Sequence, residues 1–187
     1  MRRAGWVVLV ALTAACGLFA GDSVADDQKG TEVDFDGMRS RAPAEWKEEG
    51  AKGPLRYMQF KLPRVKGDER DAEVVIFKGI GGSAKQNIDR WKGQFEAPEG
   101  KKLDDVAKVK EFKVGKAEVT YLDIYGTYLD KFPPFAPNAK TVKRPHYHML
   151  AAHFEGPKNP YHIKLIGPEK TVEHYRKGFD EWLKNFK

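Results

Sequence analysis

Three of the five histidines of this 187-residue chain lie in one short segment, PHYHMLAAHFEG, residues 145–156. If the segment is a strand, His146 and His148 point to the same side, because side chains alternate along a strand. Such a pair can chelate one metal ion, but a zinc site needs a third or fourth ligand, which the sequence does not name. His153 has the opposite parity and would lie across a hairpin from His162. No cofactor is expected, and a metal-binding protein that uses His146 and His148 is the alternative interpretation.

A second candidate set is polar and lies along an expected helix. Asn87, Arg90 and Gln94 are spaced at i, i+3 and i+7. They form a polar ridge beside Trp91, at the border of the apolar face of this helix. Arg90 could reach a carboxylate on the sheet, and Asp123 is the expected partner. Two interpretations stay open: an ion pair that fastens the helix to the sheet, or a small anion or peptide terminus held by Arg90 through bidentate contacts.

The sequence shows no motif that is typical of a catalytic site. Residues 78–84, KGIGGSA, match a dinucleotide-binding glycine motif in form, but the parallel strand-helix-strand context is missing. Ser83 and Gln86 fit a capping box instead, which gives the serine a structural role. Neither Ser83 nor Ser40 lies in a nucleophile elbow. The chain is therefore not expected to be an enzyme.

A proline-rich segment, residues 129–145, separates two expected strands. Loops of this length without secondary structure are usually functional or disordered. Aromatic and cationic side chains interleave along it: Lys131, Phe132, Phe135, Lys140, Lys143 and Arg144. Such a mixture suits the docking of a partner or an anionic surface. The other interpretation is a loop that folds back over the sheet and buries both rings.

The elements that must position these residues are mostly strands. Alternation, β-branched residues and turn signals predict strands near residues 33–40, 55–62, 72–77, 107–114, 117–128, 146–155 and 161–167. Apolar periodicity predicts a helix over residues 83–95, which Gly93 weakens without ending, and an amphipathic helix over the last twenty residues. The fold class is therefore α+β, with an antiparallel sheet of about seven strands flanked by helices.

Several of these segments resemble a family of small exported bacterial proteins similar to the PsbP-like superfamily. The resemblance covers residues 46–95, 119–128, 147–155 and 163–183, with its sharpest marks at Asn87, Arg90, Trp91, Gln94, Phe95 and Gly167-Pro168. It implies an α/β/α sandwich. Known members include an extrinsic lumenal subunit of photosystem II, a small-GTPase-binding import factor and cell-envelope lipoproteins, so it also implies a non-enzymatic binding or assembly role.

The N-terminal segment has the layout of a secretory signal peptide. Arg2 and Arg3 precede an apolar run, and a small-x-small cleavage site ends at Ala25. The alternative is a lipid anchor at Cys16, the only cysteine of the chain. We expect a signal peptide over residues 1–25, a flexible lead-in over residues 26–32 and a single domain over residues 33–187.

The net charge and the expected export limit the classes of binding partner. The net charge is +6, and lysine and glutamate alternate through much of the chain without a dense basic run. Nucleic acid is therefore not an expected partner, and no transmembrane segment is expected after signal cleavage. The sequence predicts a periplasmic or secreted protein that binds a protein partner in the cell envelope.

Overall fold

The computed structural model describes residues 30–53, 55–132 and 138–187. The strands are β1 Glu32–Phe35, β2 Met38–Arg41, β3 Lys47–Glu49, β4 Arg56–Leu62, β5 Ala72–Lys78, β6 Phe95–Glu96, β7 Ala107–Val114, β8 Ala117–Phe132, β9 Lys140–Glu155 and β10 Pro160–Pro168. The helices are α1 Ala84–Lys92, α2 Leu103–Val106 and α3 Glu169–Lys184. The predicted signal peptide, Cys16 and Phe135 lie outside the described residues.

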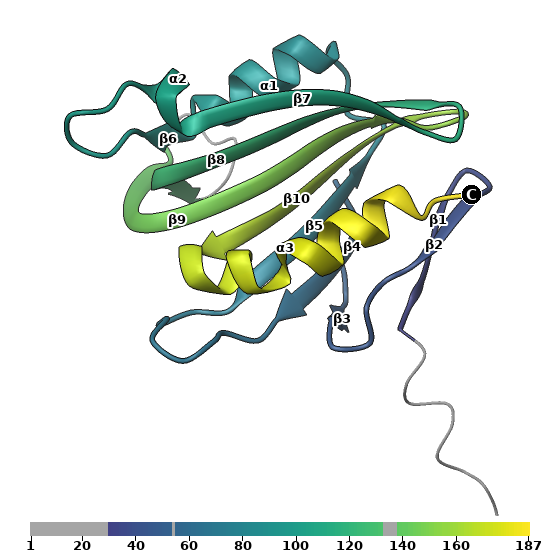
Figure 1. The fold of residues 1–187 in the computed structure, drawn as a ribbon, viewed down its shortest axis with the longest axis horizontal. Coiled ribbons are helices and arrows are strands. Elements are labelled where there is room, and N and C mark those ends of the chain that lie inside the picture. The colour runs from purple at the N-terminus through teal and green to yellow at the C-terminus, as the bar shows by residue number, and fades with distance from the viewer. Residues whose placement is uncertain (1–29, 54, 133–137) are drawn as a thin grey trace, which may run out of the picture.

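One antiparallel sheet of eight strands forms the middle of the molecule (Figure 1). Its order is β3-β4-β5-β10-β9-β8-β6, and β7 pairs with β8 on the same edge as β6. The predicted α+β class and antiparallel sheet are confirmed. The sheet has more strands than expected, and β1 and β2 form a separate hairpin.

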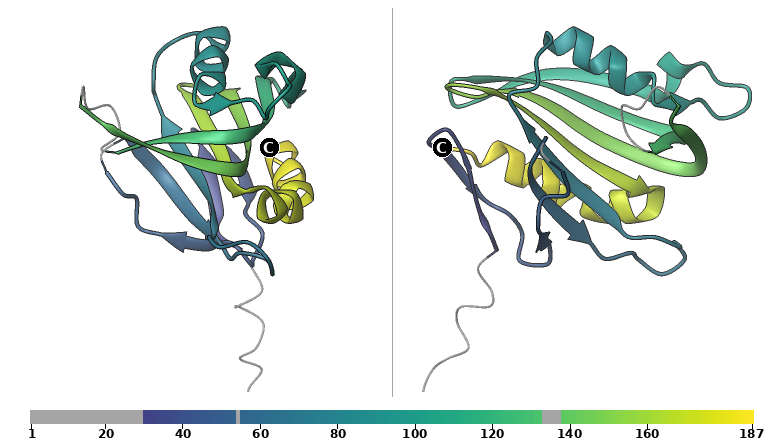
Figure 2. Two further views of the ribbon diagram at one scale, coloured as in Figure 1. Left: turned by 90° about the vertical axis from the view of Figure 1, so that its left-hand side faces the viewer. Right: turned by 180° about the vertical axis from the view of Figure 1, so that it is seen from behind.

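Each face of the sheet carries its own core, with α1 on one face and α3 on the other (Figure 2). Trp91 of α1 is 1% exposed and packs with Ile88 on Leu122, Ile124 and Met149. Trp182 of α3 is 2% exposed in the larger core. Burying an aromatic side chain of this size contributes about 2–3 kcal/mol. The predicted sandwich, with both tryptophans buried, is therefore confirmed.

The first helix is shorter than predicted. Ser83 caps its N-terminus, and the capping box with Gln86 is present as expected. The helix ends at Lys92, because Gly93 is its C-cap and donates its N–H to the carbonyl oxygen of Asp89. Phe95 then opens β6 and pairs with Tyr128. The prediction that the helix continues through Phe95 is wrong, although Phe95 is buried in the same core.

The last helix follows its predicted pattern. Its apolar stripe is buried against the sheet: Val172, Tyr175, Phe179, Trp182, Leu183 and, just beyond the helix, Phe186. Pro168 precedes the first helical residue, where its missing N–H costs nothing. Among the described residues, no helix combines the length and apolar character needed to cross a membrane.

The predicted proline-rich loop is largely a β-ribbon. β8 and β9 stay paired from the body of the sheet to Phe132 and Lys140. At its base the register shifts between Tyr128–Arg144 and Gly126–Tyr147, so that Pro145 and His146 lie opposite one residue. This is a β-bulge, a position where proline is tolerated within a sheet. We call the paired residues 127–132 and 140–146 the β8–β9 ribbon.

Candidate binding cleft

A large hollow in the described part of the chain lies between the β8–β9 ribbon and the face of β4 and β5. It is an open cleft of about 800 Å³, which we call the ribbon cleft. Its lining comes from the floor, from the β4–β5 connection, and from the ribbon with the adjoining parts of β9 and β10. The floor contributes Lys52, Arg56, Asp71 and Glu73, and the connection contributes Arg64, Glu69 and Arg70. The ribbon contributes Tyr128, Asp130, Lys131, Phe132 and Arg144, β9 contributes Tyr147, and β10 contributes Ile166 and Gly167.

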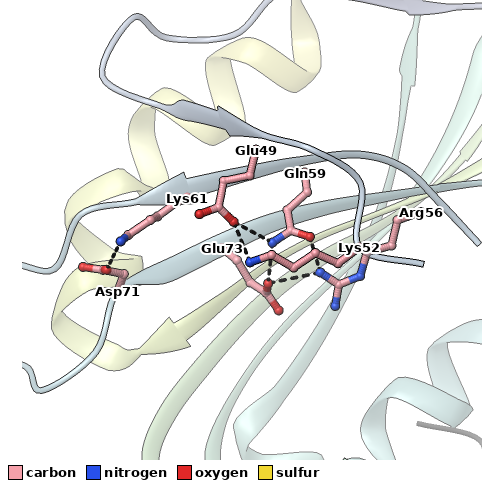
Figure 3. A network of polar contacts seen from close by, with 7 residues as sticks. All are labelled: Glu49, Lys52, Arg56, Gln59, Lys61, Asp71 and Glu73. Atoms are coloured by element: carbon pink, nitrogen blue, oxygen red, sulfur yellow. Dashed lines mark hydrogen bonds and ion pairs between the residues drawn. The ribbon is translucent and has the colours of Figure 1, made fainter. Parts of the chain in front are cut away.

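The floor of the cleft is a polar network on the face of the sheet that also carries α1 (Figure 3). Gln59 is only 2% exposed, and its Nε2 donates to Glu49 Oε2 at 3.0 Å and to Glu73 Oε2 at 3.4 Å. Its Oε1 accepts from Arg56 Nη1. Both the oxygen and the nitrogen of this buried amide are hydrogen-bonded. Gln59 therefore holds the carboxylates of Glu49 and Glu73 and the guanidinium of Arg56 in place over β4 and β5.

The ribbon wall is aromatic and cationic. Tyr128 and Tyr147 stack with ring centroids 5.9 Å apart and an interplanar angle of 11°. Burial raises the pKa of Tyr128 to about 12, so its hydroxyl stays protonated at neutral pH. Arg144 pairs with Asp130 across the ribbon at 2.7 Å. Beyond them Phe132 is 72% exposed and Val142 47% exposed, which leaves an apolar surface outside any core.

Cations outnumber carboxylates in the cleft. Six lining residues are lysine or arginine, and four are aspartate or glutamate. Three of the carboxylates already have a cationic partner: Asp71, Glu73 and Asp130. Within residues 30–53, 55–132 and 138–187, Arg70 and Lys131 make no ion pair, so their charges are available to an anionic group.

The carboxylates around the floor are poor proton donors. A hydrogen bond from Lys52 lowers the pKa of Glu49, and hydrogen bonds from Lys61 and the Arg64 backbone lower that of Asp71. A general acid needs the opposite shift. The described lining also contains no serine, threonine or cysteine that could act as a nucleophile. The arrangement therefore suits binding through charge and stacking.

The predicted pair of Arg90 and Asp123 is not formed. Asp123 accepts from Arg176 Nη1 and contacts His148 Nε2, both at 2.7 Å, on the face that α3 covers. Arg90 is on α1, at the opposite face, where its Nη2 donates to Asn87 Oδ1. The prediction was wrong because it did not fix which parity of β8 faces α1.

The other two members of that set have structural partners. Asn87 is fully buried and donates to the carbonyl oxygens of Gly82 and Ser83, which closes the turn before α1. Gln94 Oε1 accepts from Lys164 Nζ at 3.0 Å. The structure therefore does not bring Asn87, Arg90, Gln94 and Asp123 together as one site.

The chelating pair expected of His146 and His148 is not formed either. His146 is exposed at the bulge with φ 57°, whereas His148 is buried beside Asp123. The bulge breaks the alternation on which the prediction rested. Elsewhere in the described chain, no three histidine, cysteine or carboxylate side chains group in a way that could hold a metal ion.

The second predicted histidine pair is confirmed. His153 and His162 lie opposite each other in the register of β9 and β10, with Nδ1 and Nε2 2.9 Å apart. Glu155 Oε1 lies 2.7 Å from His153 Nε2. Burial lowers the pKa of His162 to about 3, so this histidine is neutral. Both imidazoles are buried, and the ring of His162 packs edge-on against Trp91.

The residues predicted in the proline-rich segment are partly assembled. Lys131, Phe132 and Arg144 line the ribbon cleft. Lys143 instead binds Glu96 through Nζ, at 2.8 Å. Sequence reasoning missed Arg70, Tyr128 and Tyr147. No local motif marks them, because the cleft joins segments that are distant in sequence.

No family model matches the chain, and no curated protein matches it. Among solved structures, the solution structure of cyanobacterial PsbP (CyanoP) from Synechocystis sp. PCC 6803 is similar, with 13% identity and a TM-score of 0.45. The match covers 95% of this chain and 98% of that one.

Proposed function

We propose that this chain is a non-enzymatic binding protein that holds an extended acidic segment of a partner protein in the ribbon cleft. The observation that carries the proposal is the pairing of available cations, Arg70 and Lys131, with the stacked rings of Tyr128 and Tyr147 in one open cleft. Arginine gives bidentate contacts to carboxylates, and tyrosine supplies rigid contact area at low entropic cost.

The shape and charge of the cleft favour a peptide over a small ligand. Its lining mixes charged side chains with three aromatic rings and is open to solvent along the ribbon. Small-molecule sites are mostly apolar and bury most of their ligand. Phe132 and Val142 extend the apolar contact beyond the cleft along the ribbon, as a segment several residues long requires.

A fluorescently labelled peptide of alternating glutamate and tyrosine tests this function by anisotropy. Arg70→Glu reverses one available charge and should weaken binding about tenfold, or about 1.4 kcal/mol. Lys108→Glu is the matched control, because Lys108 is an exposed lysine on β7, outside the cleft. Binding should also weaken with added salt. Equal affinity for the wild type and Arg70→Glu, or equal losses in both variants, would count against the proposal.

We also propose that the protein acts after export, in the cell envelope or outside the cell. The proposal rests on the basic and apolar segments that precede Ala25. Intact mass measurement of the protein recovered from a secreting host should show a chain that begins at Asp26. A chain that begins at an acylated Cys16 would support the lipoprotein alternative, and an uncut cytoplasmic chain would contradict export.

A further inference from the structure

A second hollow continues the ribbon cleft past Tyr147. It has a volume of about 400 Å³ and lies between the β4–β5 connection and the β-bulge of β9. The linings of the two hollows share four residues: Glu69, Arg70, Arg144 and Tyr147. Because these residues border both spaces, one extended segment can pass from the ribbon cleft into the second hollow, which we call the bulge hollow.

His146 lines the bulge hollow and has an unusual backbone conformation. Its φ is 57°, in the left-handed region that residues other than glycine rarely adopt, and its side chain is exposed. Backbone conformations of this kind cluster at functional sites. Packing in a core does not account for a histidine at this position. An imidazole that donates a ring N–H to an anion in the hollow does account for it.

The groups that can hold an anion lie at the two ends of the joined hollows. Lys131 lines the ribbon cleft, and Arg70 and His146 line the bulge hollow. The other two cations of the bulge hollow already have carboxylate partners, one on β6 and one on β8. Each end of the joined hollows therefore has its own donor for a carboxylate.

The β4–β5 connection is fastened where it borders the bulge hollow. Asp68 Oδ2 accepts from the backbone N–H and the hydroxyl of Thr171, at 2.8 Å and 2.6 Å. This carboxylate is therefore bound to the first turn of α3 and does not compete for the cations of the hollow. The same contact holds the neighbouring Arg70 at the junction of the two hollows.

The register of the ribbon gives the distance between the two ends. Lys131 lies opposite Thr141 of β9, and His146 is five residues further along that strand. At about 3.3 Å per residue, the two ends are about 17 Å apart. Side chains an even number of positions apart point to the same side of an extended segment. Six positions, or about 20 Å, is the first such spacing that covers this distance.

We propose that the bulge hollow is a second anion site of the ribbon cleft, and that the bound segment carries two acidic residues about six positions apart. One carboxylate is held by Lys131, and the other is held by Arg70 and His146. The part of the segment between them lies over the stacked tyrosine rings of the ribbon wall. This inference rests on the proposed binding function and adds the spacing of acidic residues that the cleft selects.

Two peptides of the same composition test this spacing by isothermal titration calorimetry on the intact protein. The first is Glu-Gln-Tyr-Gln-Tyr-Gln-Glu, the second is Glu-Gln-Glu-Gln-Tyr-Gln-Tyr, and both are blocked at both termini. Their charges are equal, but only the first peptide can place a glutamate at both ends at once. It should bind the wild type about tenfold more tightly than the second, because its second contact is intramolecular.

Variants at the two ends test which side chains hold the glutamates. His146→Asn and Lys131→Gln should each weaken binding of the first peptide about fivefold. The second peptide reaches one end only, so it should lose affinity in at most one of these variants. His174→Asn and Lys108→Gln are the matched controls, because both side chains are exposed and line neither hollow. Asparagine also adopts the left-handed conformation, so the urea midpoint of His146→Asn should equal that of the wild type.

The possible results distinguish the second site from the proposed function. If neither peptide binds, the proposed function fails and the second site fails with it. If the wild type binds both peptides equally, or if a folded His146→Asn variant keeps full affinity for the first peptide, the second site is overturned while binding in the ribbon cleft stands. Should His146→Asn unfold, the comparison of the two peptides on the wild type still decides.

Discussion

Asp123 lies between a histidine and an arginine where α3 meets the sheet. Burial by itself would raise the pKa of this carboxyl, but hydrogen bonds with His148 and Arg176 outweigh burial and lower the pKa from 3.8 to about 2. Arg176 also bonds Glu173 of its own helix, at 2.7 Å. The carboxylate therefore stays charged through most of the acid range and fastens α3 to β8 and β9.

A depressed pKa in the folded state makes stability depend on pH. The contribution of Asp123 is present above pH 3.8 and is lost as the pH falls toward 2, because the unfolded chain takes up the proton first. The loss should be on the order of 2 kcal/mol. We expect Asp123→Asn to lower the free energy of unfolding by a similar amount at neutral pH, measured by urea denaturation.

The Asp123→Asn variant should also lose less stability than the wild type between pH 4 and pH 2, because the contribution of Asp123 to that decline is gone. Asp89→Asn is the control, since Asp89 is 56% exposed and its ion pair with Lys85 lies on the surface of α1. Exposed pairs of this kind contribute little. If the Asp123→Asn variant and the wild type lost stability in parallel over that pH range, the pairing of Asp123 would not be the cause.

At the scale of elements, the β8–β9 ribbon is the part of the fold that extends from the body and still keeps its pairing. Leu129 lies opposite Lys143 in the register, and the ribbon continues to Phe132 and Lys140. Beyond the pair of Leu129 and Lys143, the side chains of Phe132 and Val142 are exposed and belong to neither core. The outer ribbon is therefore expected to serve binding more than stability.

Shortening the ribbon separates these roles. Replacing residues 130–142 by Asn-Gly would join Leu129 to Lys143 through a two-residue turn, the length that suits a hairpin. The free energy of unfolding should change by less than about 1 kcal/mol, while affinity for the acidic peptide should fall at least about tenfold. A large loss of stability in thermal denaturation would show instead that the outer ribbon packs against the body.

These elements also show which parts of the fold can be predicted from the sequence. Periodicity located both long helices and the central strands, because apolar side chains at a regular spacing leave a strong local signal. The end of α1 at Gly93 and the pairing within the ribbon were not predicted, because both depend on tertiary contacts. Phe95 pairs with Tyr128, and the N–H of Leu129 donates to the carbonyl oxygen of Gln94. Local propensity does not contain that information.

At the scale of the whole molecule, one sheet separates two cores and leaves part of one face without a helix. α3 and the β1–β2 hairpin close the larger core, while α1 covers β8, β9 and β10 on the other face. On that face β4 and β5 carry the polar floor of the ribbon cleft (Figure 3). The sequence alone could not place this cleft, since its lining joins segments that are distant in the sequence.

The central claim is that the acidic segment binds in the ribbon cleft, and amide chemical-shift mapping during titration with the glutamate–tyrosine peptide tests it most directly. The largest shifts should fall at Arg70, Tyr128, Lys131, Arg144 and Tyr147, and in the Arg70→Glu variant the same shifts should require about tenfold more peptide. Shifts confined to the Lys-rich edge strand β7 or to α3, or no shifts with a peptide that still binds, would contradict the claim.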